Sequence, residues 1–313
     1  MRRIRKTNVE TPLIVPSFSS AISQDPSEIG RIHNSINEYI FDVSLISAYD
    51  LYYNYIPVEN VSWSNLVFLD SGKYETDSLQ HSKLLKKWNR DLYLELIKKL
   101  TPLNQFIIVN YDQKTSTETQ LNSANVFFDK IDHIEFTKCF LYKPLSKKSY
   151  IISIRDIQKN IDLFSDFDII GFADKEIGNS FLSRCETIVK IREILFESEI
   201  STPIHIFGCL DPLTIISYYL CGADIFDGLA WLKYTFHNNF ALYSNNYSLI
   251  KNQWTNTYDN NTMLNSIENL NVLNHLSKCL RHFCRTKKFE SLNIEENILH
   301  QIKTLTGTAG IDY

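Results

Sequence analysis

Short apolar runs rich in β-branched and aromatic residues recur along the chain, and their length and composition are typical of β-strands. Most of these runs are continuous rather than alternating, as expected for strands that are buried on both faces. Eight runs fit this description: LIVPSFS from Leu13, FDVSLISAYD from Phe41, LVFLDSG from Leu66, FIIVNYD from Phe106, HIEFTKCFLY from His133, DIIGFAD from Asp168, PIHIFGC from Pro203 and ADIFDGL from Ala223.

Helical patterns separate several of the predicted strands. Apolar residues recur at three- and four-residue spacing over 79–100, 181–196 and 212–222. The last of these segments follows an N-cap residue, Asp211, and ends at Gly222. Strands that alternate with helices predict an α/β fold, and eight of them predict a (β/α)8 TIM barrel. A doubly wound open sheet is the alternative, but no G-x-G-x-x-G sequence follows the first strand.

The length of the chain allows one large domain or two smaller ones. It has 313 residues, of which 44% are hydrophobic, so it can bury a large core. We expect residues 1–240 to form the barrel and residues 241–313 to form a C-terminal helical extension packed on it. A net charge of −4 argues against a protein that coats nucleic acid non-specifically, although it allows a local basic face.

The sequence predicts a cytoplasmic protein. No apolar run approaches the roughly 20 residues of a membrane helix. The first residues, MRRIRKTNVETP, are basic, but no apolar segment follows them as it would in a signal peptide. The six cysteines are scattered, and two of them, Cys209 and Cys221, lie in apolar runs, as expected of reduced thiols.

Polar residues at the ends of the predicted strands are the candidates for chemistry, because the active site of a (β/α)8 barrel lies at the C-terminal ends of its strands. Strand three ends in Asp70 and Ser71, strand four in Asp112 and strand eight in Asp227, while strand six carries Gly171. A single acid at such a position is commonly a helix cap or a turn residue. Three acids at the same end of a barrel instead predict a shared site.

Several segments occur in an order that a known family shares. They are TPLIVPSFSS at the first strand, LDSGKY at the third, IIVNYDQ at the fourth, IHIFGCLDP at the seventh and GADIFDGLAW at the eighth. This order resembles the tRNA-guanine transglycosylase superfamily, the queuine and archaeosine tRNA-ribosyltransferases, which exchange a guanine base for a 7-deazaguanine. The resemblance runs from about Thr11 to Tyr234. Relatives in this superfamily place 7-deazaguanines in DNA.

The resemblance implies a role for individual residues. Asp227 would be the nucleophile that attacks C1′ of the target nucleoside, and Asp70 would be the general acid/base. Ser71 and Asp112 would hydrogen-bond the edge of the base. The list of implied base-binding residues is completed by Tyr74, which would flank the ring, and Gly171, whose neighbourhood would offer backbone groups. No cofactor is implied; the partners would be guanine or a 7-deazaguanine and a nucleic acid.

The chemistry suits these residue types. A carboxylate can form a covalent glycosyl intermediate, which divides one substitution into two steps. Such a route needs one carboxyl group as nucleophile and another as proton carrier. A guanine-like edge carries adjacent N–H donors that a carboxylate can accept. The target base must also leave its stack to reach such a pocket.

The sequence departs from the family at three places around the predicted site. Lys73 stands where the family usually has glycine, and GLAWLKY, over 228–234, replaces a Pro-Thr-Arg segment. We expect Lys73 and Lys233 to contact nucleic acid or a partner. On strand five, Tyr142 to Pro144 stands where the family has Gln-Gly, so a glutamine that reads the base would be missing.

The family's zinc motif is also absent, because the sequence contains no C-x-C-x-x-C. His275, Cys279 and His282 lie on one face of a predicted helix, but they span roughly 10 Å along its axis, which is long for one tetrahedral ion. We therefore predict a zinc-less, amphipathic helix. Two basic segments, 2–6 and 278–288, would contact phosphates or simply form solvated surfaces.

Three functions are compatible with these features. The first is an enzyme that exchanges guanine for a 7-deazaguanine of the preQ0 or preQ1 type in tRNA or DNA, as in queuosine synthesis. The second is a nucleobase-binding or base-transfer protein of an antiphage defence operon that acts on a partner other than tRNA. The third is a non-catalytic subunit of a transglycosylase, although such a subunit need not keep both Asp70 and Asp227. A homodimer is compatible with each.

Overall fold

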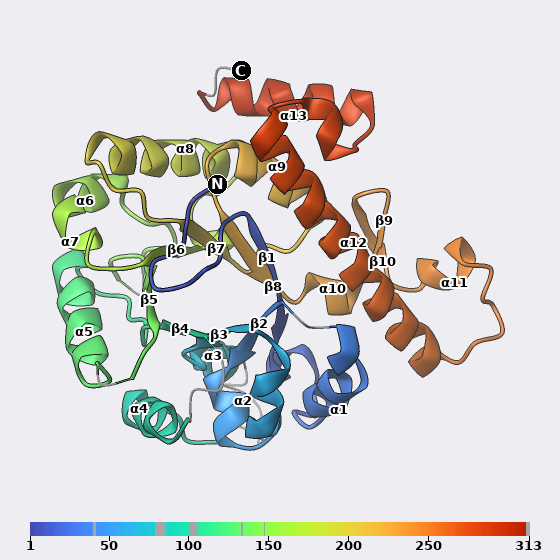
Figure 1. Cartoon of the computed structure of the whole chain (residues 1–313), viewed down its shortest axis with the longest axis horizontal. Helices are drawn as coiled ribbons and strands as arrows, with labels where there is room; N and C mark the ends of the chain where they lie inside the picture. Colours follow the sequence, from blue (N-terminus) through green and yellow to red (C-terminus); the bar gives the residue numbers. More distant parts are fainter. Residues whose placement is uncertain (40–41, 79–85, 101–104, 133, 147, 311–313) are drawn as a thin grey trace.

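The computed structural model describes residues 1–39, 42–78, 86–100, 105–132, 134–146 and 148–310. In this part of the chain eight parallel strands close into a barrel in sequence order, so the predicted (β/α)8 barrel is confirmed (Figure 1). The barrel closes because β1 pairs with β8, and this pairing excludes the open sheet. The strands are β1 Leu13–Phe18, β2 Val43–Ser47, β3 Leu66–Asp70, β4 Gln105–Val109, β5 Thr137–Tyr142, β6 Ile169–Ala173, β7 Ile204–Phe207 and β8 Ile225–Gly228.

Helices surround the barrel and follow most of its strands (Figure 1). Short 3-10 helices add η1 Ser20–Ile22, η2 Asn37–Tyr39, η3 Val58–Trp63, η4 Asp174–Glu176 and η5 Phe289–Leu292. The α-helices are α1 Glu28–Ser35, α2 Ala48–Tyr52, α3 Lys73–Ser78, α4 Arg90–Lys99, α5 Thr117–Asp129, α6 Ile154–Lys159, α7 Ile161–Phe164, α8 Phe181–Glu197, α9 Pro212–Leu220, α10 Ala230–Lys233, α11 Asn246–Ile250, α12 Tyr258–Thr286 and α13 Glu296–Thr308.

The helix predicted over 79–100 is shorter in the structure. Helix α4 begins at Arg90, because the Asn89 side chain accepts hydrogen bonds from two N–H groups of the first turn. Residues 86–89 are not helical, and residues 79–85 lie outside the described part of the chain. The other two predicted helices are confirmed as α8 and α9.

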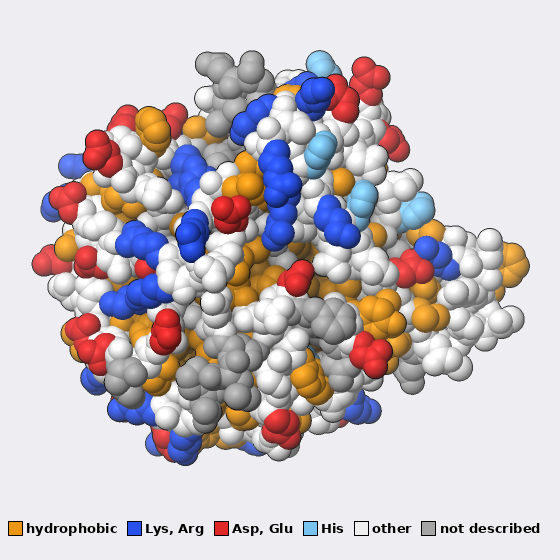
Figure 2. Space-filling model, in the orientation of Figure 1, with side chains coloured by type: hydrophobic (Ala, Val, Ile, Leu, Met, Phe, Trp, Pro, Cys, Tyr) orange, Lys and Arg blue, Asp and Glu red, His pale blue; other side chains and the backbone are white. Residues whose placement is uncertain are grey.

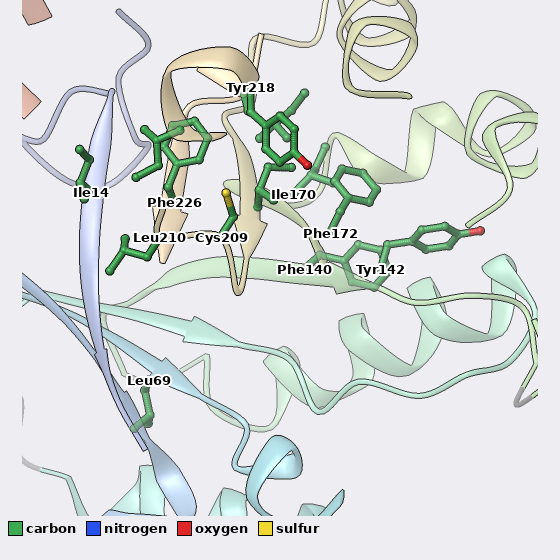
Figure 3. Packing of buried hydrophobic residues seen from close by; sticks show 14 of the residues in the cluster. Ile14, Leu69, Phe140, Tyr142, Ile170, Phe172, Cys209, Leu210, Tyr218 and Phe226 are labelled. Atoms are coloured by element: carbon green, nitrogen blue, oxygen red, sulfur yellow. The ribbon is translucent and has the colours of Figure 1, made fainter. Parts of the chain in front are cut away.

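Alternate side chains along each strand point to opposite faces, and they build two apolar layers. One layer lies between the strands and the helices; Figure 3 shows Ile14, Leu69, Phe140, Ile170 and Phe226 in it. The other fills the interior of the barrel with Ile4, Leu13, Val15, Leu45, Leu66, Phe68, Ile107, Val109, Cys139, Leu141, Ile169 and Ile225. The interior is therefore packed, and only residues at the strand ends can form a site.

The N-terminal end of the barrel is closed by the first ten residues and by a buried acid. Ile4 is buried in the interior cluster. Asp224, just before β8, is also buried and forms ion pairs with Arg2 and Arg192. It accepts a further hydrogen bond from the N–H of Ile204, at the start of β7. Asp224 is thus a structural acid whose charge is balanced by two guanidinium groups.

The C-terminal region packs beside the barrel wall. A hairpin of β9 Tyr234–His237 and β10 Phe240–Tyr243 lies across residue 240, where we expected the barrel to end. It leads to α11 and the long α12 (Figure 1). On α12 the predicted apolar stripe is buried. The stripe consists of Leu273, Leu276, Leu280 and Phe283.

None of the helices in the described residues is long and apolar enough to cross a membrane.

Candidate active site

The C-terminal end of the barrel, called the mouth from here on, brings the three predicted acids together. Asp70 ends β3, Asp112 follows β4, and Asp227 lies in β8. They are close enough for the charges of Asp112 and Asp227 to raise the pKa of Asp70. The structure adds two acids, Asp50 and Glu75, at the same mouth.

Asp227 is buried and accepts three hydrogen bonds. The Ser17 hydroxyl, from β1, donates to Oδ2 at 2.8 Å. His205 Nε2, from β7, lies 2.9 Å from Oδ1, and the N–H of Gly208 donates to the same oxygen at 3.3 Å. Gly208 has φ +79°, a conformation that favours glycine. Oδ2 therefore accepts only one hydrogen bond in the structure and keeps a lone pair for another contact.

His205 is fully buried, and its environment fixes its ring. The ring stacks on Phe207 with 3.8 Å between centroids and meets the edge of Phe68 at 5.2 Å. Nδ1 is buried without a hydrogen-bond partner in the described residues. A proton on Nδ1 would be buried without an acceptor, so the neutral tautomer with its proton on Nε2 suits this site. This tautomer donates to Asp227.

Asp70 sits in a tight turn at the end of β3. Its Oδ2 accepts a hydrogen bond from the N–H of Gly72 at 3.2 Å. Gly72 has φ +76°, and a Cβ there would lie 2.7 Å from the backbone N of Tyr49, so the turn requires glycine. The indole N–H of Trp88 donates to the carbonyl of Ser71 at 2.9 Å and holds the same turn. Asp70 is thereby fixed beside the mouth.

Burial raises the pKa of Asp70 to about 8, and the charges of Glu75 and Asp112 contribute to the increase. The raised pKa favours the protonated form of the Asp70 carboxyl group. Within the described residues, no Lys or Arg forms an ion pair with Asp50, Asp70 or Glu75. Asp70 thus differs from Asp227 in its hydrogen bonding, because Asp227 accepts from three donors and Asp70 from one.

Asp50 and Glu75 are two further buried acids, and each interacts electrostatically with Asp70. Asp50 accepts a hydrogen bond from the N–H of Ser20 at 2.7 Å, and Glu75 accepts one from the Ser19 hydroxyl. Burial raises the pKa of each carboxyl group to about 7. Asp50 carries a sequence signal, since it follows the second apolar run as Asp70 follows the third. Glu75 has no such signal.

The predicted base-edge residues adjoin each other on the β4 side of the mouth. Ser71 donates to Asp112 Oδ1 at 3.2 Å, and both residues are buried. Lys143, just after β5, lies with Nζ 4.0 Å from Asp112 Oδ2 and 2.7 Å from Glu176. Lys73 Nζ donates to the backbone oxygen of Asp112 at 2.7 Å. Lys73 therefore folds back onto the site.

Gly171 lies on β6 beneath the ring of Phe207. A Cβ on Gly171 would come within 2.4 Å of Phe207 Cε2, so only glycine leaves room for the ring. The half-buried Phe207 ring therefore covers this part of the strand. Phe207 did not stand out in the sequence, because a phenylalanine in a strand is usually part of the core.

The structure leaves two predicted residues away from these contacts. Tyr74, at the start of α3, has 49% of its surface exposed. Lys233, at the end of α10, is exposed and lines a cavity of about 420 Å³ beside α1 and α12.

On α12, Cys279 Sγ lies 3.4 Å from His275 Nε2. In the described residues no group of three His, Cys, Asp or Glu side chains could hold a metal ion.

Comparison with known proteins does not assign this chain to a family. No family model matches the sequence. No curated protein is significantly similar to it.

We predict that Glu75→Gln flattens the pH dependence of stability. The raised pKa values of Asp50, Asp70 and Glu75 mean that the folded state binds more protons than the unfolded state, in which carboxyl groups have pKa values of about 4. Their contribution to the free energy of unfolding is full below about pH 4 and is lost as the pH rises through 7 to 8. Glu75→Gln removes one of the three titrating groups. It also removes a neighbouring charge that raises the pKa of Asp70.

Urea denaturation at about pH 5.5 and about pH 8 would measure this effect. The wild type should lose more stability between the two values than Glu75→Gln. The exposed Glu95, which pairs with Lys99 on α4, offers a matched control, and Glu95→Gln should behave like the wild type. Equal slopes for Glu75→Gln and the wild type would contradict the assignment of Glu75 to a coupled acid cluster.

Proposed function

We propose that this protein is a transglycosylase of the tRNA-guanine transglycosylase type, which exchanges guanine for a 7-deazaguanine base in nucleic acid through a covalent aspartyl-glycosyl intermediate. One observation carries the proposal. Two carboxyl groups share the mouth, and their environments differ: Asp227 is held by three donors, whereas Asp70 has a pKa of about 8. Carboxyl groups with separated roles are the requirement of a two-step glycosyl transfer.

In the first step, Asp227 Oδ2 attacks C1′ of the target nucleoside. The bond between C1′ and the base breaks, and Asp70 donates its proton to the departing guanine. Oδ2 is the reacting oxygen because it accepts only the hydrogen bond from Ser17 in the structure. Oδ1 keeps its two donors and becomes the carbonyl oxygen of the ester.

In the second step, the ionised Asp70 removes a proton from N9 of the incoming base. N9 then attacks C1′, and the ester bond to Asp227 breaks. The electron pair returns to the Asp227 carboxylate, where the donors on Oδ1 stabilise the returning charge. Asp70 ends the cycle protonated, so the exchange consumes no proton and needs no external reductant or oxidant.

The mouth also suits a guanine-type base. Such a base presents two adjacent N–H donors and a carbonyl oxygen along one edge. Asp112, oriented by Ser71, offers carboxylate acceptors, and the Lys143 ammonium lies 4.0 Å away as a donor. The half-buried ring of Phe207 adds an apolar face for the planar ring. We propose that Lys143 serves in place of the family's glutamine.

The direct test is the incorporation of a labelled base. The protein is incubated with radiolabelled guanine or preQ0 and with either tRNA or DNA, and label in the polymer is counted. The wild type should incorporate label into at least one polymer. Asp227→Ala should abolish incorporation, and Asp70→Asn should reduce it at least about 100-fold, because the proton carrier is lost.

Asp129→Asn provides a matched control, because Asp129 is an exposed acid at the end of α5. This variant should retain wild-type activity. If neither polymer gains label with the wild-type protein, or if Asp227→Ala remains active, the proposed function is wrong.

A second prediction concerns His205. His205→Phe removes a donor from Asp227 Oδ1 but keeps an aromatic ring against Phe207. We expect kcat to fall by about 100-fold with little change in KM, because the lost bond stabilises charge that changes during the reaction. His205→Gln should recover part of the loss, since its amide can donate. Equal losses in both variants, or a loss confined to KM, would contradict this role.

A further inference from the structure

We infer that an aromatic and basic surface on the rim of the mouth binds the single-stranded nucleotides that flank the reacting one. This inference rests on the proposed function, because it names the partner of the same site. The surface, called the rim platform, consists of Tyr52, Tyr53, Tyr55, Lys86, Lys87 and Trp88.

The rim platform adjoins the catalytic turn directly. Helix α2 begins immediately after β2, so Tyr52 and Tyr53 lie at the mouth end of the barrel. Trp88 donates its indole N–H to the carbonyl of Ser71 at 2.9 Å, one residue after Asp70. A base seated beside Asp70 would therefore have its neighbours in the strand close to these rings.

Several rings of the platform pack edge to face, and all of them are partly accessible. Tyr52 lies 5.1 Å from Tyr53 and 5.4 Å from Trp88, between centroids, and both pairs are T-shaped. Tyr52, Tyr53, Tyr55 and Trp88 are all partly accessible rather than buried. Bases stack on such rings without regard to sequence, and each stacked base contributes about 1–3 kcal/mol.

Cations are built into the same surface. The Lys86 ammonium lies 4.7 Å from the ring centroid of Tyr53 and 4.8 Å from that of Tyr55. Lys86 and Lys87 are both exposed, and the Tyr53 hydroxyl donates to the backbone oxygen of Lys87. Aromatic rings combined with lysines are the usual composition of a surface that binds single strands.

The cations at the mouth are already engaged. The Lys73 ammonium donates to the backbone oxygen of Asp112, and the Lys143 ammonium pairs with Glu176. The attraction for phosphates must therefore come from cations outside the mouth. Exposed lysines beside stacking rings fit a single strand better than a duplex, whose bases are already stacked.

A second basic surface lies at the opposite end of the barrel. Figure 2 shows Lys and Arg side chains gathered where the N-terminal segment meets α12. Arg2 and Lys287 line a cavity of about 710 Å³ there, next to Asp224 at the start of β8. This surface also carries rings, from Tyr219, Phe283 and Phe289, but it faces away from the mouth, so it serves as the control.

The test measures the affinity of fluorescein-labelled oligonucleotides of about 12 residues, as RNA and as DNA, for the protein without free base. Asp227→Ala provides the background, so that binding is separated from chemistry. Tyr53→Leu should weaken binding about 10-fold or more, whereas Tyr53→Phe, which keeps the ring, should bind like the background protein. Lys86→Gln with Lys87→Gln should reduce the slope of log K against log salt by about 1.4.

Lys287→Gln with Lys288→Gln, on the opposite surface, should leave the affinity and the salt slope unchanged. Thermal unfolding checks that each variant is folded. In the exchange assay, Tyr53→Leu should raise KM for the polymer and leave kcat unchanged. If the Lys287 and Lys288 variant loses affinity while the rim variants do not, or if duplexes bind as tightly as single strands, the rim platform is refuted. Base exchange by the wild type would still stand.

Discussion

The pairing of β1 with β8 is the constraint on which the site depends. It joins the first and last strands, with Val15 opposite Asp227, and so closes the barrel. Closure places the Ser17 hydroxyl, two residues further along β1, 2.8 Å from Asp227 Oδ2. It also brings the end of β8 to the same mouth as the end of β3, far earlier in the sequence. Without closure, Asp70 and Asp227 would have no reason to meet.

The buried acids at the two ends of the barrel differ in whether cations pair with them. At the N-terminal end, Asp224 is neutralised by Arg2 and Arg192, an arrangement that stabilises the fold. At the mouth, Asp50 and Glu75 are buried beside the partly accessible Asp70, and loss of solvation raises the pKa of each carboxyl group. Clusters that disfavour their own charge are costly to the fold and are typical of functional sites. The asymmetry supports a catalytic mouth, which a non-catalytic subunit would not require.

Much of this architecture was predictable from the apolar runs, because each buried strand is a continuous run and the acids at the ends are easy to find. The period of two along a strand carries further information. Ile225 points into the barrel, so Asp227, two residues later, does as well. The same alternation along β7 places His205 and Phe207 on the inner face. His205 was nevertheless missed, because its role appears only when Asp227 lies across the sheet from it.

Other features depend on contacts that a pattern does not contain. Glu75 lies on α3, which follows the turn at Gly72, and its carboxyl group accepts a hydrogen bond from Ser19, just after β1. The helix predicted over 79–100 shows the limit of periodicity, since the Asn89 cap, rather than the apolar spacing, sets where α4 begins. Lys73, predicted to contact nucleic acid or a partner, has its ammonium bonded to the backbone oxygen of Asp112, a contact that the sequence did not indicate.

We propose that Asp227 forms a covalent bond with the sugar of a nucleic acid. The most direct measurement is denaturing electrophoresis of the protein mixed with nucleic acid in the absence of free base, followed by peptide mapping of any adduct by mass spectrometry. We expect an adduct that survives denaturation, is carried by Asp227, and disappears when preQ0 or guanine is added. Base exchange without such an adduct, or an adduct mapped to another residue, would contradict it.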